Sequence, residues 1–543
     1  MTVPVAAIPV LIVGGGPVGL SASIFLSAFG IRSLLVERHP GTSIVPKARG
    51  INARTMEIYR QFGVEDAVRA AGLPPEATGL IVWTESLAGR EIERRVPGRA
   101  SPRNQGLSPV ANCLCAQDDL EPVLRRFAEA QAPAELRFDT ELLSATQDAD
   151  GVDAVLLDRR SGVENRVRAQ YVIAADGNQS KLRRLVGARM IGPEKIYDSV
   201  NMVFNADLRP WTADRPSALY FVEQPDLRGT FLTINAHDRW GFLVHSLSRY
   251  GFTPADFTDE RCTAMIRQAV GVPDLPVRIL GLSAWEASAF VADQYRHGRI
   301  FLTGDAAHEM PPTGGFGMNT GVQDVHNLTW KLASVLRGEA GDSLLDTYHA
   351  ERQPWGTLTT KVALDNCLSM GRTERQEEAK LPRAEFLSEQ GLIFGASYDS
   401  AAVIPDGTMP AVNDSPITQY LPSARPGARA PHVWLWRDGE RISTVDLFGP
   451  RFVLLTGPEG AGWRDAVGGR AVAYTVGREL EDRDGVWQQA YGVAADGAVL
   501  VRPDGQVAWR SRSAGGDAAR VLAGVFGYGY AAPLAGTATL RQP

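Results

Sequence analysis

Three short and mostly apolar runs, at residues 10–13, 171–175 and 299–303, each lead directly into a segment that contains glycine, and the second and third segments also contain aspartate. Continuous apolar runs of this length are typical of strands that are buried on both faces of a sheet. Apolar residues at helical spacing follow the first run over residues 20–29 and the third run over residues 322–335. The pattern therefore predicts strand–turn–helix units of a parallel α/β sheet.

The first unit has the form of a dinucleotide cradle. Residues 14–19 read GGGPVG and fit G-x-G-x-x-G, and a second predicted strand, residues 33–36, ends at Glu37. Gly14 permits the tight turn, Gly16 lets the backbone approach a pyrophosphate, and Gly19 lets helix and strand pack closely. Glu37 is placed to accept hydrogen bonds from ribose hydroxyls, and the helix N-terminus attracts the phosphates. We assign Pro17 and Arg38, which flank these positions, to the same cofactor site.

Residues 76–107 and 188–284 lie between the cofactor motifs, and the second segment alternates apolar and polar side chains, which is typical of antiparallel strands. We expect them to form a substrate-binding sheet over the cofactor. Aromatic side chains of the second segment could line its pocket, although each is more often plain core. We select Tyr220, Phe231 and Trp240 from a wider set that also includes Trp211, Phe221, Phe242 and Trp285.

Six prolines between residues 405 and 431 indicate an extended connector. Strand-like runs follow at residues 444–448, 452–456 and 498–502, and we expect a separate domain there. Cysteine is absent after Cys367, so dithiol chemistry is excluded from this region. A structural or dimer-stabilising role is the preferred interpretation.

Composition limits the class of protein. The chain has 543 residues and a net charge of −6 with no cationic block, so nucleic-acid binding has no electrostatic support. Four cysteines are too few for a disulfide framework, and the eight histidines form no metal-binding motif, so we expect no metal. Residues 3–31 carry no charge, but the glycines at 14–16 argue against a membrane span. We expect a cytoplasmic protein.

The motifs together resemble the p-hydroxybenzoate hydroxylase family of flavoprotein aromatic hydroxylases. G-x-G-x-x-G, the DGNQSKLR segment at 176–183 and the GDAAHEMPPTGGFGMN segment at 304–319 match its three fingerprints in order. The chain is most similar to hydroxylases of aromatic polyketide biosynthesis, through residues 114–122 and 432–455. No second G-x-G-x-x-G is present, so NAD(P)H is expected to bind only transiently.

The resemblance implies roles for particular residues. Gln117, Asp176 and Asp305 should contact FAD, and the peptide at Pro311 should lie beside the reactive flavin carbon. Relatives place an arginine after the second strand, and here either Lys47 or Arg49 could serve. The segment before the third-unit helix should meet the flavin ring through its backbone, and it contains Pro312, Gly315, Gly317, Met318 and Asn319.

The expected fold is α/β and α+β. It has a Rossmann-like FAD-binding domain (1–75, 108–187 and 285–400), an antiparallel-sheet substrate domain (76–107 and 188–284) and a thioredoxin-like C-terminal domain (405–543). The implied enzyme is an FAD-dependent monooxygenase that uses NAD(P)H and O2, through a flavin C4a-hydroperoxide, to hydroxylate a phenolic and polycyclic polyketide. A Baeyer–Villiger or rearranging oxygenation and a non-catalytic flavin-binding sensor stay open, as do a monomeric and a homodimeric state.

Overall fold

The computed structural model describes residues 6–77, 79–96, 106–370, 389–515 and 517–527. The chain forms two compact units. Unit 1 contains residues 1–326, 352–396 and 411–422, and unit 2 contains residues 327–351, 397–410 and 423–543. Helices α8 (Gly317–Leu336) and α9 (Asp346–Ser369) thus contribute to both. The mixed α/β fold class predicted from the sequence is confirmed.

An eight-stranded sheet forms the first half of unit 1. Its main path runs in the order β18 (Arg296–His297), β19 (Ile300–Leu302), β10 (Glu164–Ala174), β1 (Ala6–Val13), β2 (Ser33–Val36) and β7 (Ala134–Arg137). The hairpin β8 (Thr140–Gln147) and β9 (Val152–Asp158) extends from β10. The pairs from β19 to β7 are parallel. The three apolar runs therefore lie side by side, and their glycine-rich ends meet at one edge.

Two glycines of the first turn are required by the packing of unit 1. A Cβ on Gly14, whose φ is +113°, would lie 2.1 Å from the carbonyl oxygen of Ala175. A Cβ on Gly19 would lie 1.9 Å from the carbonyl oxygen of Gly14, between helix α1 (Pro17–Ala28) and β1. Both residues therefore serve the close approach of backbone to backbone.

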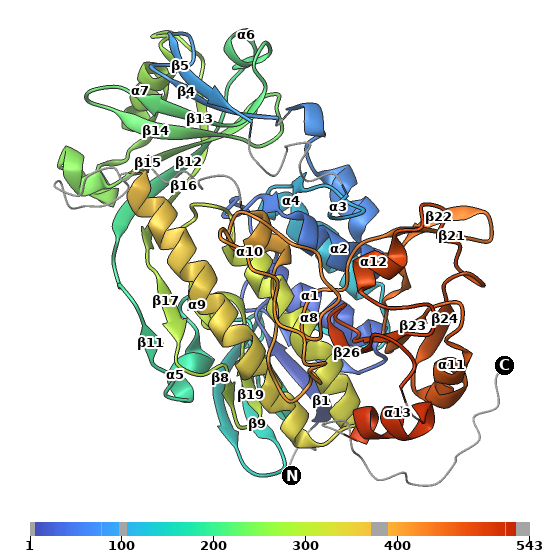
Figure 1. Cartoon of the computed structure of the whole chain (residues 1–543). Coiled ribbons are helices and arrows are strands. Elements are labelled where there is room, and N and C mark those ends of the chain that lie inside the picture. The colour runs from blue at the N-terminus through green and yellow to red at the C-terminus, as the bar shows by residue number, and fades with distance from the viewer. Residues whose placement is uncertain (1–5, 78, 97–105, 371–388, 516, 528–543) are drawn as a thin grey trace. The chain divides into compact units, whose positions relative to one another are not determined.

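A seven-stranded sheet forms the second half of unit 1. Its order is β16 (Arg278–Ala287), β12 (Tyr197–Asn205), β15 (Arg239–His245), β14 (Arg228–Thr233), β13 (Ser217–Glu223), β4 (Leu80–Thr84) and β5 (Glu91–Arg95). Figure 1 shows the blue strands β4 and β5 in one sheet with the green strands. The expectation of an antiparallel sheet is wrong at one pair, because β4 runs parallel to β13.

Shorter elements complete unit 1. Its helices include α2 (Ala53–Gln61), α3 (Glu65–Ala71), α4 (Gln117–Glu129), α5 (Lys181–Leu185), α6 (Arg209–Thr212), α7 (Asp259–Val270) and α10 (Gln390–Phe394). Its short strands include β3 (Gly50–Ile51), β6 (Cys113–Leu114), β11 (Met190–Ile191), β17 (Phe290–Ala292) and β20 (His308–Glu309). No helix in the described ranges is both long and apolar enough to cross a membrane.

Unit 2 contains a mixed four-stranded sheet. Its order is β24 (Val472–Thr475), β23 (Val453–Thr456), β25 (Ala498–Val501) and β26 (Val507–Ser511). Helices α11 (Ala461–Val467), α12 (Trp487–Tyr491) and α13 (Ala518–Gly527) and the hairpin β21 (Trp434–Arg437) and β22 (Glu440–Ser443) accompany it. Residues 444–447 form a 3₁₀ turn and not the predicted strand, because Ser443 and Asp446 form a reciprocal cap around it.

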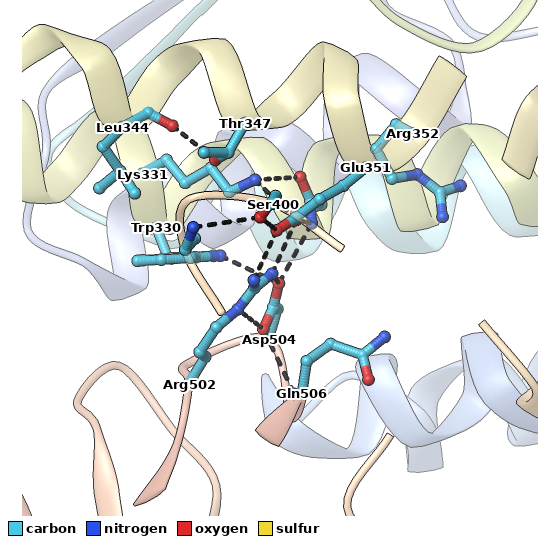
Figure 2. A network of polar contacts seen from close by, with 12 residues as sticks. Trp330, Lys331, Leu344, Thr347, Glu351, Arg352, Ser400, Arg502, Asp504 and Gln506 are labelled. Atoms are coloured by element: carbon cyan, nitrogen blue, oxygen red, sulfur yellow. Dashed lines mark hydrogen bonds and ion pairs between the residues drawn. The ribbon is translucent and has the colours of Figure 1, made fainter. Parts of the chain in front are cut away.

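A buried charge cluster holds the helical part of unit 2 to its sheet (Figure 2). Glu351 accepts hydrogen bonds from both terminal nitrogens of Arg502, at 2.6 and 2.9 Å, and from Lys331 Nζ at 2.8 Å. Asp504 accepts from Arg502 and, at 3.1 Å, from the indole N–H of Trp330. Each of the four charged side chains is at most 3% exposed. The boundary predicted at residue 405 is therefore incomplete, since residues 327–351 belong to this unit.

Candidate active site

A cavity of about 1990 Å³ lies within unit 1, between the glycine-rich edge of the first sheet and one face of the seven-stranded sheet. Its floor includes the first-turn glycines, the segment 37–51, the loop after β10, Asp305 and residues 309–318. Its roof comes from strands β12 to β16. The three sequence fingerprints, which lie far apart in the chain, are thus brought to one site.

Gly16 differs from Gly14 and Gly19, the other two glycines of the G-x-G-x-x-G motif, in what surrounds it. A Cβ at Gly16 would meet no described atom nearer than Glu121 Oε1, at 3.9 Å, and its φ of −78° suits any residue. No side chain caps helix α1, although Gly16 is its N-cap. The fold itself therefore does not need glycine here, and the open space with free helix N–H groups fits a phosphate ligand.

Glu37 lies at the expected place beside this turn. Its Oε2 accepts from the backbone N–H of Gly15 at 2.7 Å, and its Oε1 accepts from that of His39 at 2.9 Å. These bonds fix the carboxylate at the cavity wall, and each oxygen retains a lone pair for a ribose hydroxyl. Arg38 and Pro17 also line the cavity.

Lys47 and Arg49 both reach the cavity, but their partners differ. Arg49 donates to the carbonyl oxygens of Thr233, at 2.8 Å, and Ala218, at 2.6 Å, and so ties its loop to the roof. Lys47 is exposed, and no hydrogen bond or ion pair joins its Nζ to the rest of the described chain. Burial raises the pKa of both Asp305 and Glu121, and the positive charge of Lys47 opposes that rise. Lys47 is therefore the cation available to an anionic ligand.

Both polar atoms of the Gln117 side chain form hydrogen bonds within the protein. Its Oε1 accepts from the N–H of Ala48 at 3.1 Å, and its Nε2 donates to Glu121 Oε1 at 2.6 Å. Glu121, which is 3% exposed, also accepts from the N–H of Ser43 at 2.6 Å. The two side chains thus position the loop that carries Lys47, and sequence reasoning missed Glu121, although it lies one helical turn from Gln117.

The acidic residues of the other two fingerprints have different surroundings. Asp176 accepts from Ser180 Oγ at 2.6 Å and from the N–H of Leu182 at 3.1 Å, so it caps helix α5 while it lines the cavity. Asp305 has no hydrogen bond from any described residue, and its side chain opens into the cavity. Asp305 is therefore the better placed of the two to accept from ligand hydroxyls.

His308 faces away from the cavity. It is fully buried, and its Nε2 lies 2.7 Å from Asp324 Oδ2, which also accepts from the N–H of Gly304 at 3.1 Å. Arg352 donates to the other oxygen of Asp324 at 2.8 Å. This group fixes the turn that presents Asp305, so His308 is structural.

The segment before α8 lines the cavity through Pro311, Pro312, Gly315, Gly317 and Met318. Gly314 and Gly315 have φ values of +109° and +68°, which favour glycine. Two predicted cofactor residues do not line the cavity. Asn319 is 2% exposed and donates to the carbonyl oxygens of Gly50 and Gly315, and Gly19 serves helix packing.

The aromatic pocket prediction is wrong for Tyr220, Phe231 and Trp240. All three are at most 2% exposed and lie in the core between the seven-stranded sheet and helix α7. Successive side chains of a strand point to opposite faces, so their neighbours reach the cavity. The cavity face has three cross-strand rows, which are Ile81–Leu219–Leu232, Phe221–Thr230–Leu243–Asn201–Ser283 and His245–Trp285. Of the wider aromatic set, Phe221 and Trp285 line it.

The floor of the cavity fits FAD. The open cradle at Gly16, the N-terminus of α1 without a side-chain cap, the Lys47 ammonium and the Asp305 carboxyl all line it. These groups suit a pyrophosphate and a chain of hydroxyls. Within the described residues, no group of three or more His, Cys, Asp or Glu side chains is arranged to hold a metal ion.

The chain is similar to known proteins both in sequence and in structure. The family described as "FAD binding domain" matches residues 7–363, and "Aromatic-ring hydroxylase, C-terminal" matches residues 423–528. Tetracenomycin B2 monooxygenase-dioxygenase from Streptomyces olivaceus is 40% identical over 95% of this chain and 98% of its own. 4-Methyl-5-nitrocatechol 5-monooxygenase from Burkholderia sp. is 41% identical over 94% of this chain and 95% of its own. A crystal structure of aklavinone-11 hydroxylase with FAD and aklavinone is 36% identical, with a TM-score of 0.86 over 97% of this chain and all of that one.

Proposed function

This chain belongs to the family of FAD-dependent aromatic-ring hydroxylases, and we propose that it hydroxylates a polycyclic aromatic polyketide with NAD(P)H as electron donor. The relatives leave the size of the aromatic substrate open. One is named for a tetracenomycin, whereas another is named for a single-ring nitrocatechol. The choice between a polycyclic and a single-ring substrate therefore rests on the size of the cavity.

The cavity volume of about 1990 Å³ favours a large second ligand. Sites for one drug-sized ligand span about 300–1,000 Å³. With FAD on the floor, the remaining space lies under the roof, where Ile81, Leu219 and Leu232 form an apolar row. Such a surface suits the face of a fused ring system, because apolar area removed from water stabilises the complex.

The reaction balances as Ar–H + O2 + NAD(P)H + H⁺ → Ar–OH + NAD(P)⁺ + H2O. FAD, when bound, supplies the transfer of electrons from NAD(P)H to oxygen. The chain binds FAD through the cradle and Lys47, orients the aromatic ring under the roof and keeps water from the reacting atoms. None of the four cysteines, which all lie in the described ranges, forms a disulfide bond, and this supports a reducing, cytoplasmic setting. The proposal is compatible with a monomer or a homodimer.

The test offers the purified FAD-loaded protein a panel of aromatic polyketides and single-ring phenols. We expect the polycyclic compounds to stimulate NAD(P)H oxidation and to give a product that is one oxygen atom heavier with its rings intact. A ring-opened or lactone product would indicate Baeyer–Villiger oxygenation, and bound FAD without stimulated oxidation would indicate a sensor. Turnover of single-ring phenols alone would refute the proposed substrate class.

A pair of variants tests the assignment of the roof. Leu232→Trp fills the space under the apolar row, and we expect it to raise KM for polycyclic substrates more than for a single-ring phenol. Val445→Ile in unit 2 is the control, because Val445 lies outside the cavity. Equal effects of Leu232→Trp on both substrate sizes would contradict the assignment.

A further inference from the structure

Seven carboxyl side chains of the described chain line the cavity, and five are held by protein donors. Glu37, Glu121 and Asp176 accept the hydrogen bonds given above, Glu141 lies 3.3 Å from Lys181 Nζ, and Glu286 lies 3.2 Å from Lys195 Nζ. The remaining two are Asp305 and Glu309. Asp305 is accounted for as a ligand acceptor, so Glu309 is left without a role.

The surroundings of the Glu309 carboxyl differ from those of a carboxyl that only stabilises the fold. Its side chain is only 18% exposed, yet no described residue donates a hydrogen bond to it. Its nearest cation is Arg183, whose terminal nitrogen lies 3.7 Å from Glu309 Oε1, beyond hydrogen-bond distance. Mostly buried carboxyl groups are normally satisfied within the protein. Glu309 lies in β20, and the alternation of the strand turns it to the cavity while His308 turns to the buried Asp324.

Arg183 cannot neutralise Glu309 fully, because it serves other acceptors. Its guanidinium donates to the carbonyl oxygens of Asn178, Asp305 and Ala306. Asp305 is the second charged group that acts on Glu309, and the facing residue of β17 is the apolar Phe290. Burial raises the pKa of Glu309 to about 7, and Asp305 adds to the rise while Arg183 opposes it.

We propose that Glu309 is the proton donor of the cavity, which supplies the one proton that each turnover consumes. This inference rests on the proposed function. The hydride of NAD(P)H and the aromatic C–H bond each provide two electrons, and O2 accepts all four. One oxygen atom enters the product, and the other leaves as water. Glu309 gives its carboxylic acid proton to the oxygen atom that leaves as water, becomes a carboxylate and regains a proton from solvent through its exposed edge. A group whose pKa lies near the working pH is suited to such an exchange.

Three variants separate this role from a structural one. Glu309→Gln keeps the shape but holds no transferable proton, and Glu309→Asp keeps the acid on a shorter side chain. Glu129→Gln is the matched control, because Glu129 is exposed, accepts from Arg125 at 2.8 Å and does not line the cavity. We expect Glu309→Gln to lower the rate of product formation about 100-fold, Glu309→Asp to restore part of it, and Glu129→Gln to leave it unchanged.

The dependence of the rate on pH gives a second test of the proposed proton donor. The donor must be protonated, so the wild-type rate should fall as pH rises through about 7, and the profile of Glu309→Gln should be flat there. A wild-type rate and profile in Glu309→Gln would overturn the proposal.

An infrared titration tests the donor without turnover. In the FAD-loaded protein without substrate, we expect the band of a protonated carboxyl to disappear between about pH 6 and 8, in the wild type and in Glu129→Gln but not in Glu309→Gln. Absence of that titration in the wild type would overturn the proposal even if polyketide hydroxylation is confirmed. A titration that depends on Glu309 would support the proton donor even if the proposed substrate class is wrong. Failure of the proton-donor proposal can therefore be distinguished from failure of the proposed function.

Discussion

Alanine substitutions at two glycines of the first turn should separate the ligand role from the folding role of one motif. At Gly16 the added methyl would enter open space, with Glu121 Oε1 as the nearest described atom at 3.9 Å. At Gly19 the same methyl would lie 1.9 Å from the carbonyl oxygen of Gly14. One change therefore acts on the bound cofactor, and the other acts on the fold.

The magnitudes follow from these distances. Gly16→Ala should cost the apo protein no more than about 1 kcal/mol, the usual loss when alanine occupies an N-cap. Forcing a methyl into contact with the pyrophosphate should weaken FAD binding by about 1–3 kcal/mol, the range for overpacking, which is about 5- to 150-fold. Gly19→Ala should destabilise the apo protein by at least as much, because a backbone atom must move.

The assay is an FAD titration of the apo protein by fluorescence, together with its urea unfolding curve. We expect Gly16→Ala to unfold near the wild-type midpoint but to bind FAD weakly, and Gly19→Ala to unfold at lower urea. Wild-type FAD affinity in Gly16→Ala would refute the placement of the pyrophosphate. Equal losses of stability in both variants would refute the argument from Cβ distances.

Three further predictions use other parts of the structure. Asp305→Asn removes a charged acceptor and should weaken FAD binding by about 1.5–3 kcal/mol, measured in the same titration, whereas unchanged affinity would leave Asp305 without a ligand role. Lys47→Met should weaken FAD binding and make it less dependent on salt; an unaltered salt dependence would point to Arg49 instead. Glu351→Gln leaves buried cations without their partner and should cost about 3–5 kcal/mol of stability, followed by tryptophan fluorescence during unfolding. The exposed pair Glu481–Arg483 is its control, and Glu481→Gln should change stability by at most about 1 kcal/mol.

The cofactor half of the site was predictable because its chemistry is local. A strand, a glycine turn and a helix N-terminus lie within 20 residues, and parallel pairing alone brings the three glycine-rich ends to one edge. The same reasoning could not choose between Lys47 and Arg49, because the choice depends on the carbonyl oxygens of Ala218 and Thr233, which lie 169 and 184 residues from Arg49 in the chain.

The substrate half was predicted less well for a geometrical reason. The sequence shows which residues alternate but not which face of a two-sided sheet is covered by helix α7 and which by the cavity. Choosing large aromatic residues selected the core face, because burial favours them there. Glu309 could not be singled out from the sequence, because one acidic residue next to a motif forms no spacing pattern that would indicate a functional role.

The opposed faces of the seven-stranded sheet divide stability from selectivity within single strands. Tyr220 and Phe231 hold the sheet to its helix, while the adjoining Phe221 and Leu232 shape the space offered to a ligand. Mutations at every second position can thus reshape the chamber while the interior packing stays whole. Proteins that descend from one such fold can therefore change their aromatic substrate without first becoming more stable. A library of variants restricted to the cavity-facing rows would test the same route in the laboratory.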